Sequence, residues 1–227
     1  MNEIKSLEQR PIGGPGPIRR TALHDTLVSH LRDMIIEGDL PPGTRLHEGQ
    51  LGEQLGVSRT PLREAIKYLA SEAGGARPSR GAVVKRFSAK DVRDMLTVLQ
   101  TLEELAGRLA CETATDAEIA EVRALHDEMV RRYEAGDRMQ YYKLNQDIHS
   151  AIARLSGNAA LADMHAMLQT RLKRIRFIGH EGPEKWAAAV AEHQEMIAAL
   201  EARDKARLSE VLGLHLTRAW ERVRDAV

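Results

Sequence analysis

Helical periodicity without interruption by strands is the feature of this sequence that most limits its fold. From Ser88 to Val227 no segment alternates apolar and polar residues as a β-strand does, and apolar residues recur every three or four positions. Ile119, Val122 and Met129 lie on one such face. Short breaks, several of them at glycine, divide the stretch into about six helices. Helices of this length with short connections pack side by side, so the pattern predicts an antiparallel all-helical bundle.

Residues 21–87 are organised differently, as three helices followed by a turn. Leucine and isoleucine at helical spacing predict the first helix from Thr21, and a short second helix covers residues 48–56. Ser58 is placed to cap the third helix. Residues 77–87 combine a Pro-Ser-Arg-Gly turn with a pair of valines and predict a small β-hairpin. Three helices and a hairpin form a winged helix-turn-helix, so the whole chain is expected to be mainly α.

Three parts are therefore expected along the chain. Residues 1–20 are rich in proline and glycine, which predicts a flexible N-terminal arm. Residues 21–87 are the predicted winged helix-turn-helix domain, and residues 88–227 are the predicted all-helical, effector-binding domain. No run of about 18 apolar residues is present to span a bilayer, and the N-terminus lacks the apolar core of a secretion signal. We therefore expect a cytoplasmic protein without a membrane partner, whose single cysteine, Cys111, is a buried structural thiol.

The charge of the chain is balanced overall but not along its length. The 33 lysines and arginines equal the 33 aspartates and glutamates, yet residues 1–87 hold 13 basic against 10 acidic side chains. Within residues 57–87 the imbalance is 7 to 2. A basic patch of that density suits contact with phosphates, although a run of charge can also be a solvated surface. Its position on the third helix and the hairpin favours nucleic acid as the partner.

The start of the third helix carries side chains of the types that bind DNA. In a helix-turn-helix this helix lies in the major groove, with its N-terminal residues toward the base edges. Arginine makes bidentate bonds to guanine, and hydroxyl groups bond to phosphates or bases. An arginine and a glycine at the hairpin tip suit a close approach to the neighbouring groove. The candidate DNA-binding residues are Ser58, Arg59, Thr60, Arg63, Arg80 and Gly81.

The same residues carry a family resemblance. The run GDLPPGTRLHEGQLGEQLGVSRTPLREAI, residues 38–66, resembles the N-terminal signature of GntR-type bacterial transcription regulators. The run RPSRGAVV resembles the wing of that family, although the first wing strand is one residue shorter here. Gly49 stands where the family often has an arginine. The resemblance implies a homodimeric transcription regulator, with a repressor as the leading interpretation, that binds a near-palindromic double-stranded DNA operator.

Three histidines of the helical region lie on faces that point inward. Asn145 and His149 are four residues apart and share a helix face, which apolar residues continue. His193 and His215 each lie within the apolar stripe of a later helix. A single histidine on such a face is usually a core residue, whereas three in one interior favour a shared divalent transition metal such as zinc or nickel. Three further histidines have no such pattern, and the spacing is as compatible with surface or loop positions as with any other: His126, His165 and His180.

The second half of the chain carries a further resemblance. The run LACETATDAEI, residues 109–119, resembles the end of the first helix and the start of the second in the FCD ligand-binding domain of FadR-like GntR regulators. The resemblance implies a small-molecule effector, an organic acid, and a metal held by Asn145, His149, His193 and His215. Leu99 stands where that family commonly has an arginine for a carboxylate. The candidate substitutes are Arg171 and Arg174, with Arg176 as a further choice, although each can also be a solvated helix charge.

Three functions of different classes account for these features. The first is a ligand-responsive transcription regulator. The second is a metalloenzyme, because three histidines and an open metal position can activate water. No HExxH motif is present, since Ser150, Gln194 and Leu216 follow the three histidines where that motif has its glutamate, and we do not expect an enzyme. The third is a constitutive DNA-binding protein with purely structural histidines.

Overall fold

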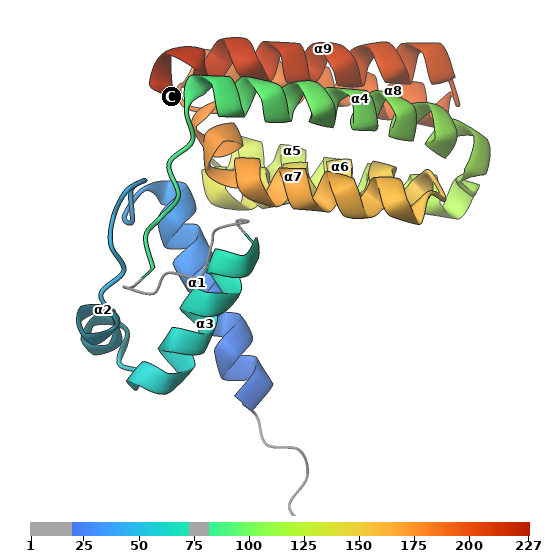
Figure 1. The fold of residues 1–227 in the computed structure, drawn as a ribbon. Coiled ribbons are helices and arrows are strands. Elements are labelled where there is room, and N and C mark those ends of the chain that lie inside the picture. The colour runs from blue at the N-terminus through green and yellow to red at the C-terminus, as the bar shows by residue number, and fades with distance from the viewer. Residues whose placement is uncertain (1–19, 73–81) are drawn as a thin grey trace, which may run out of the picture.

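The computed structural model describes residues 20–72 and 82–227 (Figure 1). Most of the predicted arm and the tip of the predicted hairpin, with Arg80 and Gly81, lie outside these ranges. The described residues are helical and include no β-strand, which confirms the mainly α prediction. The helices are α1 (Arg20–Glu37), α2 (Glu48–Leu55), α3 (Arg59–Glu72), α4 (Ala89–Thr113), α5 (Asp116–Glu134), α6 (Arg138–Leu155), α7 (Ala159–Ile178), α8 (Pro183–Glu201), α9 (Lys205–Val223) and the short 3₁₀ helix η1 (Arg224–Ala226).

Helices α1, α2 and α3 pack into a small N-terminal unit with its own apolar core. Helix α3 buries Leu62, Ala65 and Ile66 on one face, as its apolar stripe predicts, and packs against both α1 and α2. Gly56 ends α2 in the left-handed conformation, with φ 66°, so that the chain turns directly into α3. A short helix, a tight turn and a longer helix are the parts of a helix-turn-helix.

The residues after the predicted turn pair with the segment between α1 and α2. The first half of the hairpin predicted over residues 77–87 lies outside the described residues, and the described half bonds to the connection between α1 and α2. The backbone NH of Val84 donates to the carbonyl of Thr44 at 2.9 Å. A single antiparallel bridge, between Arg45 and Val83, results. The connection has no helical partners for its backbone groups, and this pairing satisfies them.

Helices α4 to α9 form the predicted bundle, in two layers (Figure 1). Helices α4, α8 and α9 make one layer, and α5, α6 and α7 make the other. Side-chain caps begin five of these six helices, as in the reciprocal capping box of Ser88 and Asp91 at α4, whereas α8 begins with Pro183 after Gly182. Helix α9 packs closely on α4 at Gly107, where a Cβ atom would lie 2.6 Å from Leu212 Cδ1. No helix in the described ranges is long and apolar enough to cross a membrane.

The two units meet where the end of α1 reaches α6 and α7. Lys143 Nζ of α6 lies 2.6 Å from Asp33 Oδ2 of α1. Arg174 Nη1 of α7 donates to the carbonyls of Ile35, at 3.0 Å, and Ile36, at 3.1 Å. Carbonyls in the last turn of a helix have no intrahelical partner and carry a partial negative charge, so an arginine there is stabilising. Helices α6 and α7 therefore hold α1 through side-chain contacts.

Two glycines of α2 are expected to respond oppositely to alanine. At Gly52 a Cβ atom would lie 2.9 Å from the carbonyl oxygen of Val57, whereas at Gly49 the nearest atom is Arg59 Nη2 at 3.8 Å. We expect Gly52→Ala to destabilise the N-terminal unit by about 1–3 kcal/mol through overpacking. Gly49→Ala should stabilise it by up to about 1 kcal/mol, the difference in helix propensity. Urea unfolding of the two variants measures this, and equal stability would contradict the close approach at Gly52.

Candidate functional site

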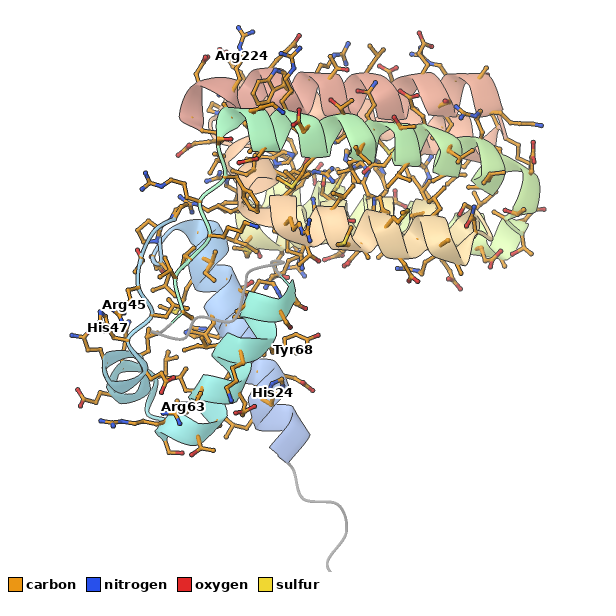
Figure 2. All side chains as sticks on the ribbon, in the orientation of Figure 1. His24, Arg45, His47, Arg63, Tyr68 and Arg224 are labelled. Atoms are coloured by element: carbon orange, nitrogen blue, oxygen red, sulfur yellow. The ribbon has the colours of Figure 1, made fainter. Side chains whose placement is uncertain are left out.

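The candidate DNA-binding residues that the structure describes lie at the start of α3. Ser58, Arg59, Thr60 and Arg63 are all exposed. Figure 2 shows Arg63 at the end of α3 that lies away from the bundle. The other two candidates lie outside the described residues. The first turns of α3 therefore offer two guanidinium groups and two hydroxyl groups to a ligand outside the protein.

Two arginines of α3 lie against α2. Arg63 donates through Nε and Nη2 to Glu48 Oε2, at 2.9 and 2.7 Å. These hydrogen bonds from Arg63 lower the pKa of Glu48, which keeps that carboxylate ionised. The guanidinium of Arg59 lies over Gly49, where a Cβ atom would be 3.8 Å from Nη2. Gly49 stands where the resembling family often has an arginine, so Arg59 brings a cation close to that position.

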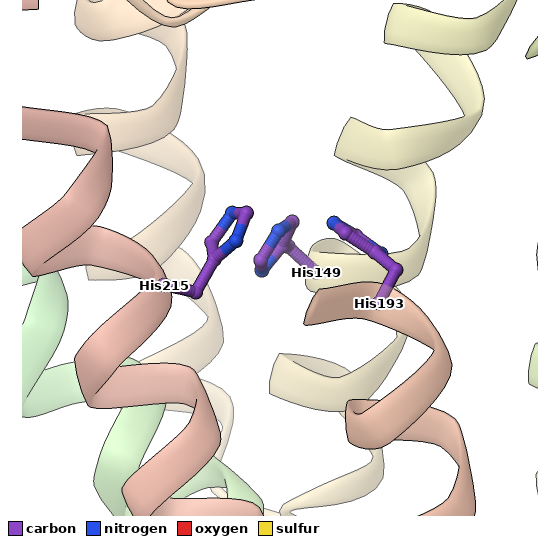
Figure 3. Close-up of side chains that lie close together, drawn as sticks. All are labelled: His149, His193 and His215. Carbon is purple, nitrogen blue, oxygen red and sulfur yellow. The ribbon is translucent and has the colours of Figure 1, made fainter. Parts of the chain in front are cut away.

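Three of the four predicted metal ligands form a cluster inside the bundle. His149 of α6, His193 of α8 and His215 of α9 point toward one another (Figure 3). Their ring centroids are 5.0, 5.0 and 5.1 Å apart, and one nitrogen of each ring lies within 4.8 Å of the others. All three side chains are buried. This spacing allows the three imidazoles to share one ion.

Asn145, the fourth predicted ligand, lies beside the cluster, one turn before His149. Its Nδ2 is 2.7 Å from His193 Nε2, and its Oδ1 accepts a hydrogen bond from Gln146 Nε2 at 3.1 Å. A half-turn of the amide exchanges the oxygen and the nitrogen without moving the rest of the side chain. After that rotation the Asn145 oxygen, a possible metal ligand, would lie where Nδ2 now lies, beside His193 Nε2.

Two buried carboxylates flank the cluster, and neither was predicted from the sequence. Glu103 of α4 has Oε2 2.9 Å from His149 Nδ1 and Oε1 3.2 Å from His165 Nε2. Glu192 of α8 has Oε2 2.7 Å from His215 Nδ1. A carboxylate beside one ring nitrogen fixes the tautomer and orientation of an imidazole and leaves the other nitrogen free to ligate. Glu103 and Glu192 are therefore positioning residues for the cluster.

Arg176 is the arginine that reaches the cluster. Its side chain is buried, with Nη2 3.5 Å from His215 Nε2 and Nη1 3.7 Å from Glu103 Oε1. Nη1 makes no hydrogen bond with any described residue. The predicted effector contacts, Arg171 and Arg174, instead line a cavity between the two units. The structure thus brings the third candidate, rather than the first two, to the histidines.

Burial keeps the clustered histidines uncharged. It lowers the pKa of His149 to about 3 and takes the pKa of His193 well below the ordinary histidine value. Burial likewise lowers the pKa of His215. For Glu103, burial alone would raise the pKa, but contacts from His149 and Arg176 hold it well below the usual value. The interior therefore combines neutral imidazoles, the form that binds metals, with an ionised carboxylate that offsets the charge of Arg176.

The cluster fits a divalent transition metal. Among the residues that the structure describes, Nε2 of His149 and Nδ1 of His193 have no hydrogen-bond partner, whereas Nδ1 of His149 lies against Glu103. Buried polar atoms normally have partners, so these nitrogens indicate a missing ligand. Three imidazoles with a neighbouring oxygen donor form a set that zinc or nickel accepts.

The remaining histidines of the bundle, to which the sequence assigns no definite position, are all buried. His126 of α5 and His165 of α7 are each 1% exposed, which excludes surface positions for them. His180 lies in the loop between α7 and α8 and is 5% exposed. Helices α5 and α7 each pack against more than one neighbour, so a polar residue beside the apolar stripe is also covered. Glu103 was missed for the same reason, although it lies four residues after the buried Leu99 and therefore on its face.

Comparison with known proteins assigns both halves of the chain to known domain families. Residues 23–84 match the description "Bacterial regulatory proteins, gntR family", and residues 94–218 match the FCD domain. The chain is 29% identical over 195 residues to the HTH-type transcriptional regulator McbR of Escherichia coli strain K12, covering 85% of this chain and 88% of that protein. It is 31% identical over 198 residues to a probable D-xylose utilization operon transcriptional repressor of Paenarthrobacter nicotinovorans, covering 84% and 86%.

The fold gives the same assignment. A solved structure of E. coli McbR/YncC matches with a TM-score of 0.72 and 27% sequence identity, covering 86% of this chain and 93% of that one. A putative regulator GntR from Rhodococcus sp. RHA1 matches at a TM-score of 0.71 and 24% identity, covering 91% and 99%, and supports the fold. These relatives are transcriptional regulators rather than enzymes, which confirms the regulator interpretation over the metalloenzyme. The chain belongs to the GntR family as a DNA-binding transcription regulator with a C-terminal FCD domain.

Proposed function

We propose that this regulator is a cytoplasmic, homodimeric repressor whose DNA affinity is changed by a small carboxylate effector at a metal in the FCD domain. The observation that carries the proposal is the polar interior around His149, His193 and His215. It contains imidazole nitrogens and an arginine Nη1 without hydrogen-bond partners among the described residues. A relative, the D-xylose operon regulator, is a probable repressor, which supports repression here.

Four side chains would hold the metal: Asn145, His149, His193 and His215. A bound zinc or nickel ion supplies a concentrated positive charge to which a carboxylate binds. Arg176 adds a second, permanent cation on the same side of the bundle, 3.5 Å from His215 Nε2. An organic acid with two nearby cations is held more strongly than a neutral molecule of the same size, because charge-assisted bonds are about twice as strong as neutral ones.

The helices that carry Asn145 and Arg176, α6 and α7, also hold α1. Asn145 lies two residues from Lys143 on α6, and Arg176 lies two residues from Arg174 on α7. The cavity beside His215 has a volume of about 10 Å³, which is room for about one water molecule. An effector of several atoms must therefore displace the surrounding helices. We infer that displacement of α6 and α7 moves α1 and changes the spacing of the two DNA-binding units in a dimer.

DNA binding is assigned to the N-terminal unit. Two copies of α3 would occupy major grooves about one helical turn, roughly 34–36 Å, apart on a near-palindromic operator. The described candidates at the start of α3 would contact bases and phosphates, and the two hairpin candidates would reach the neighbouring groove. The proposed DNA contacts are Ser58, Arg59, Thr60, Arg63, Arg80 and Gly81.

Selection of bound sequences from random duplex DNA, with the full chain, supplies an operator for the test. Zinc-loaded protein on this duplex is then exposed to a panel of mono-, di- and tricarboxylic acids, and release is measured by fluorescence anisotropy. We expect at least one acid to release the protein, and the triple variant His149→Ala, His193→Ala, His215→Ala to lose that response. Retention on DNA with every acid, or release that persists in the triple variant, would contradict the proposal.

Glu192 is expected to tune the metal affinity without touching the ion. Its contact to His215 Nδ1 orients the imidazole, and loss of such a partner typically costs about 10–100-fold in metal affinity. We expect Glu192→Gln to weaken zinc binding by that factor in a competition titration with a chelating dye. The matched control is Glu195→Gln on the same helix, because Glu195 is exposed and pairs with Arg207. Equal zinc affinity of the two variants would remove Glu192 from the site.

A further inference from the structure

A second cavity lies between the N-terminal unit and the bundle, apart from the histidine cluster. It is bounded by α1, α3, α7 and residues 82–87, and its volume is about 520 Å³. Pockets that hold small molecules typically have volumes of about 300–1,000 Å³. None of the clustered histidines lines it. A ligand in this cavity would therefore be separate from an effector bound at the metal.

The walls of the cavity are mainly apolar and come from both units. Ile35 of α1 and Leu69 of α3 face it from the N-terminal unit, and Ile175 and Ile178 of α7 face it from the bundle. Phe87, in the connection to α4, completes the wall. An alkyl chain in this space would be removed from water on several sides, which is favourable for apolar surface.

The charged groups at the cavity are strongly unbalanced. Among the described lining residues Glu72 is the one acidic side chain, and it already bonds to Arg32 at 2.8 Å. The cations that remain include Arg171 and Lys173, for which the described residues provide no carboxylate within ion-pair distance. Arg171 Nε is buried and has no hydrogen-bond partner among those residues. Burial, together with the charge of Arg32, lowers the pKa of Lys173, although the carboxylates of Glu72, Asp147 and Asp33 act in the opposite direction.

We propose that this cavity binds an anionic amphiphile: a monocarboxylic acid with a linear alkyl chain. Its carboxylate would accept hydrogen bonds from Arg171, with Lys173 as a second cation, and its chain would lie against Ile35, Leu69 and Ile178. The buried Nε of Arg171, which has no partner among the described residues, favours an anion over a neutral ligand, and the apolar walls favour a chain over a small polar acid. This site is independent of the metal site, because it shares no residue with the histidine cluster.

Dodecanoate is the probe for a calorimetric titration of the full chain, below the concentration at which the acid forms micelles. We expect one saturable site per chain. Arg171→Gln should weaken binding about tenfold, the loss of one charge-assisted bond. Ala70→Trp should abolish binding by filling the cavity, since Ala70 lines it. Dodecanol, the neutral analogue, should bind more weakly than dodecanoate.

Two control variants test whether dodecanoate binding depends on residues outside this cavity. Arg154→Gln removes an exposed arginine of α6 and should leave the affinity for dodecanoate unchanged. The triple histidine-to-alanine variant should also bind dodecanoate normally, whatever its response to other acids. No saturable binding by the folded wild type, or binding that survives Arg171→Gln and disappears in the triple histidine variant, would overturn the proposal.

Discussion

Replacement of Glu103 by alanine is expected to destabilise the chain by about 3–5 kcal/mol, the typical cost of removing one partner from a buried ion pair. Glu103 is 2% exposed and contacts Arg176, His149 and His165 from one carboxylate. Without it the Arg176 guanidinium stays charged in the bundle with no counter-charge nearby. Urea unfolding followed by circular dichroism measures the change in the free energy of unfolding.

Glu112 provides the matched control on the same helix. It bonds to Lys205 at 2.7 Å, but its side chain is 49% exposed. Exposed ion pairs contribute at most about 1 kcal/mol, so Glu112→Ala should have a small effect. Similar losses for Glu103→Ala and Glu112→Ala would show that Glu103 does not offset the charge of Arg176.

Alanine at Arg59 or Arg63 is expected to weaken operator binding about tenfold or more for each substitution, without loss of folding. A bidentate arginine contact to guanine is worth about 1–3 kcal/mol, and both side chains are exposed at the start of α3. Phosphate contacts release counterions, so the affinity of the wild type should fall steeply as salt concentration rises. Fluorescence anisotropy on the selected operator measures both effects.

Arg131→Ala is the control for this loss, because Arg131 is an exposed arginine of α5 that pairs with Glu128. It should bind the operator with the affinity of the wild type. A wild-type affinity that does not change with salt, or equal affinity of Arg63→Ala and Arg131→Ala, would remove α3 from the DNA interface.

Most of the fold could be predicted from local patterns in the sequence. Most bundle helices begin at polar caps such as Ser88 and Asp204, and α5, α6 and α7 end near glycine, so periodicity and capping agree on these segments. The extended residues near Val83 were predicted as one side of a hairpin whose other side lies outside the described residues, and their pairing with the Arg45 segment was not predicted. Pairing between segments so far apart depends on how α1 and α3 pack, which no local pattern reveals.

The candidate site was predictable where a residue interrupts an apolar stripe. His193 and His215 stand out in this way, and the structure brings them together with His149. Glu103 and Arg176 were harder to assign, because charged side chains on long helices are normally exposed and a window of sequence does not show which faces a third helix covers. Packing between helices decides which charged side chains lie beside a metal site. Helical periodicity therefore identifies the inward-facing histidines more readily than Glu103 and Arg176.

The central claim is that the histidine cluster of the FCD domain holds one divalent metal. Chelator-stripped protein titrated with zinc in a calorimeter tests it most directly. We predict one tight site per chain in the wild type and in a control variant in which three histidines of the N-terminal unit, His24, His30 and His47, are replaced by alanine. The variant lacking His149, His193 and His215 should bind no zinc at this affinity. Zinc binding that is the same in both triple variants, or absent from the wild type, would contradict the account.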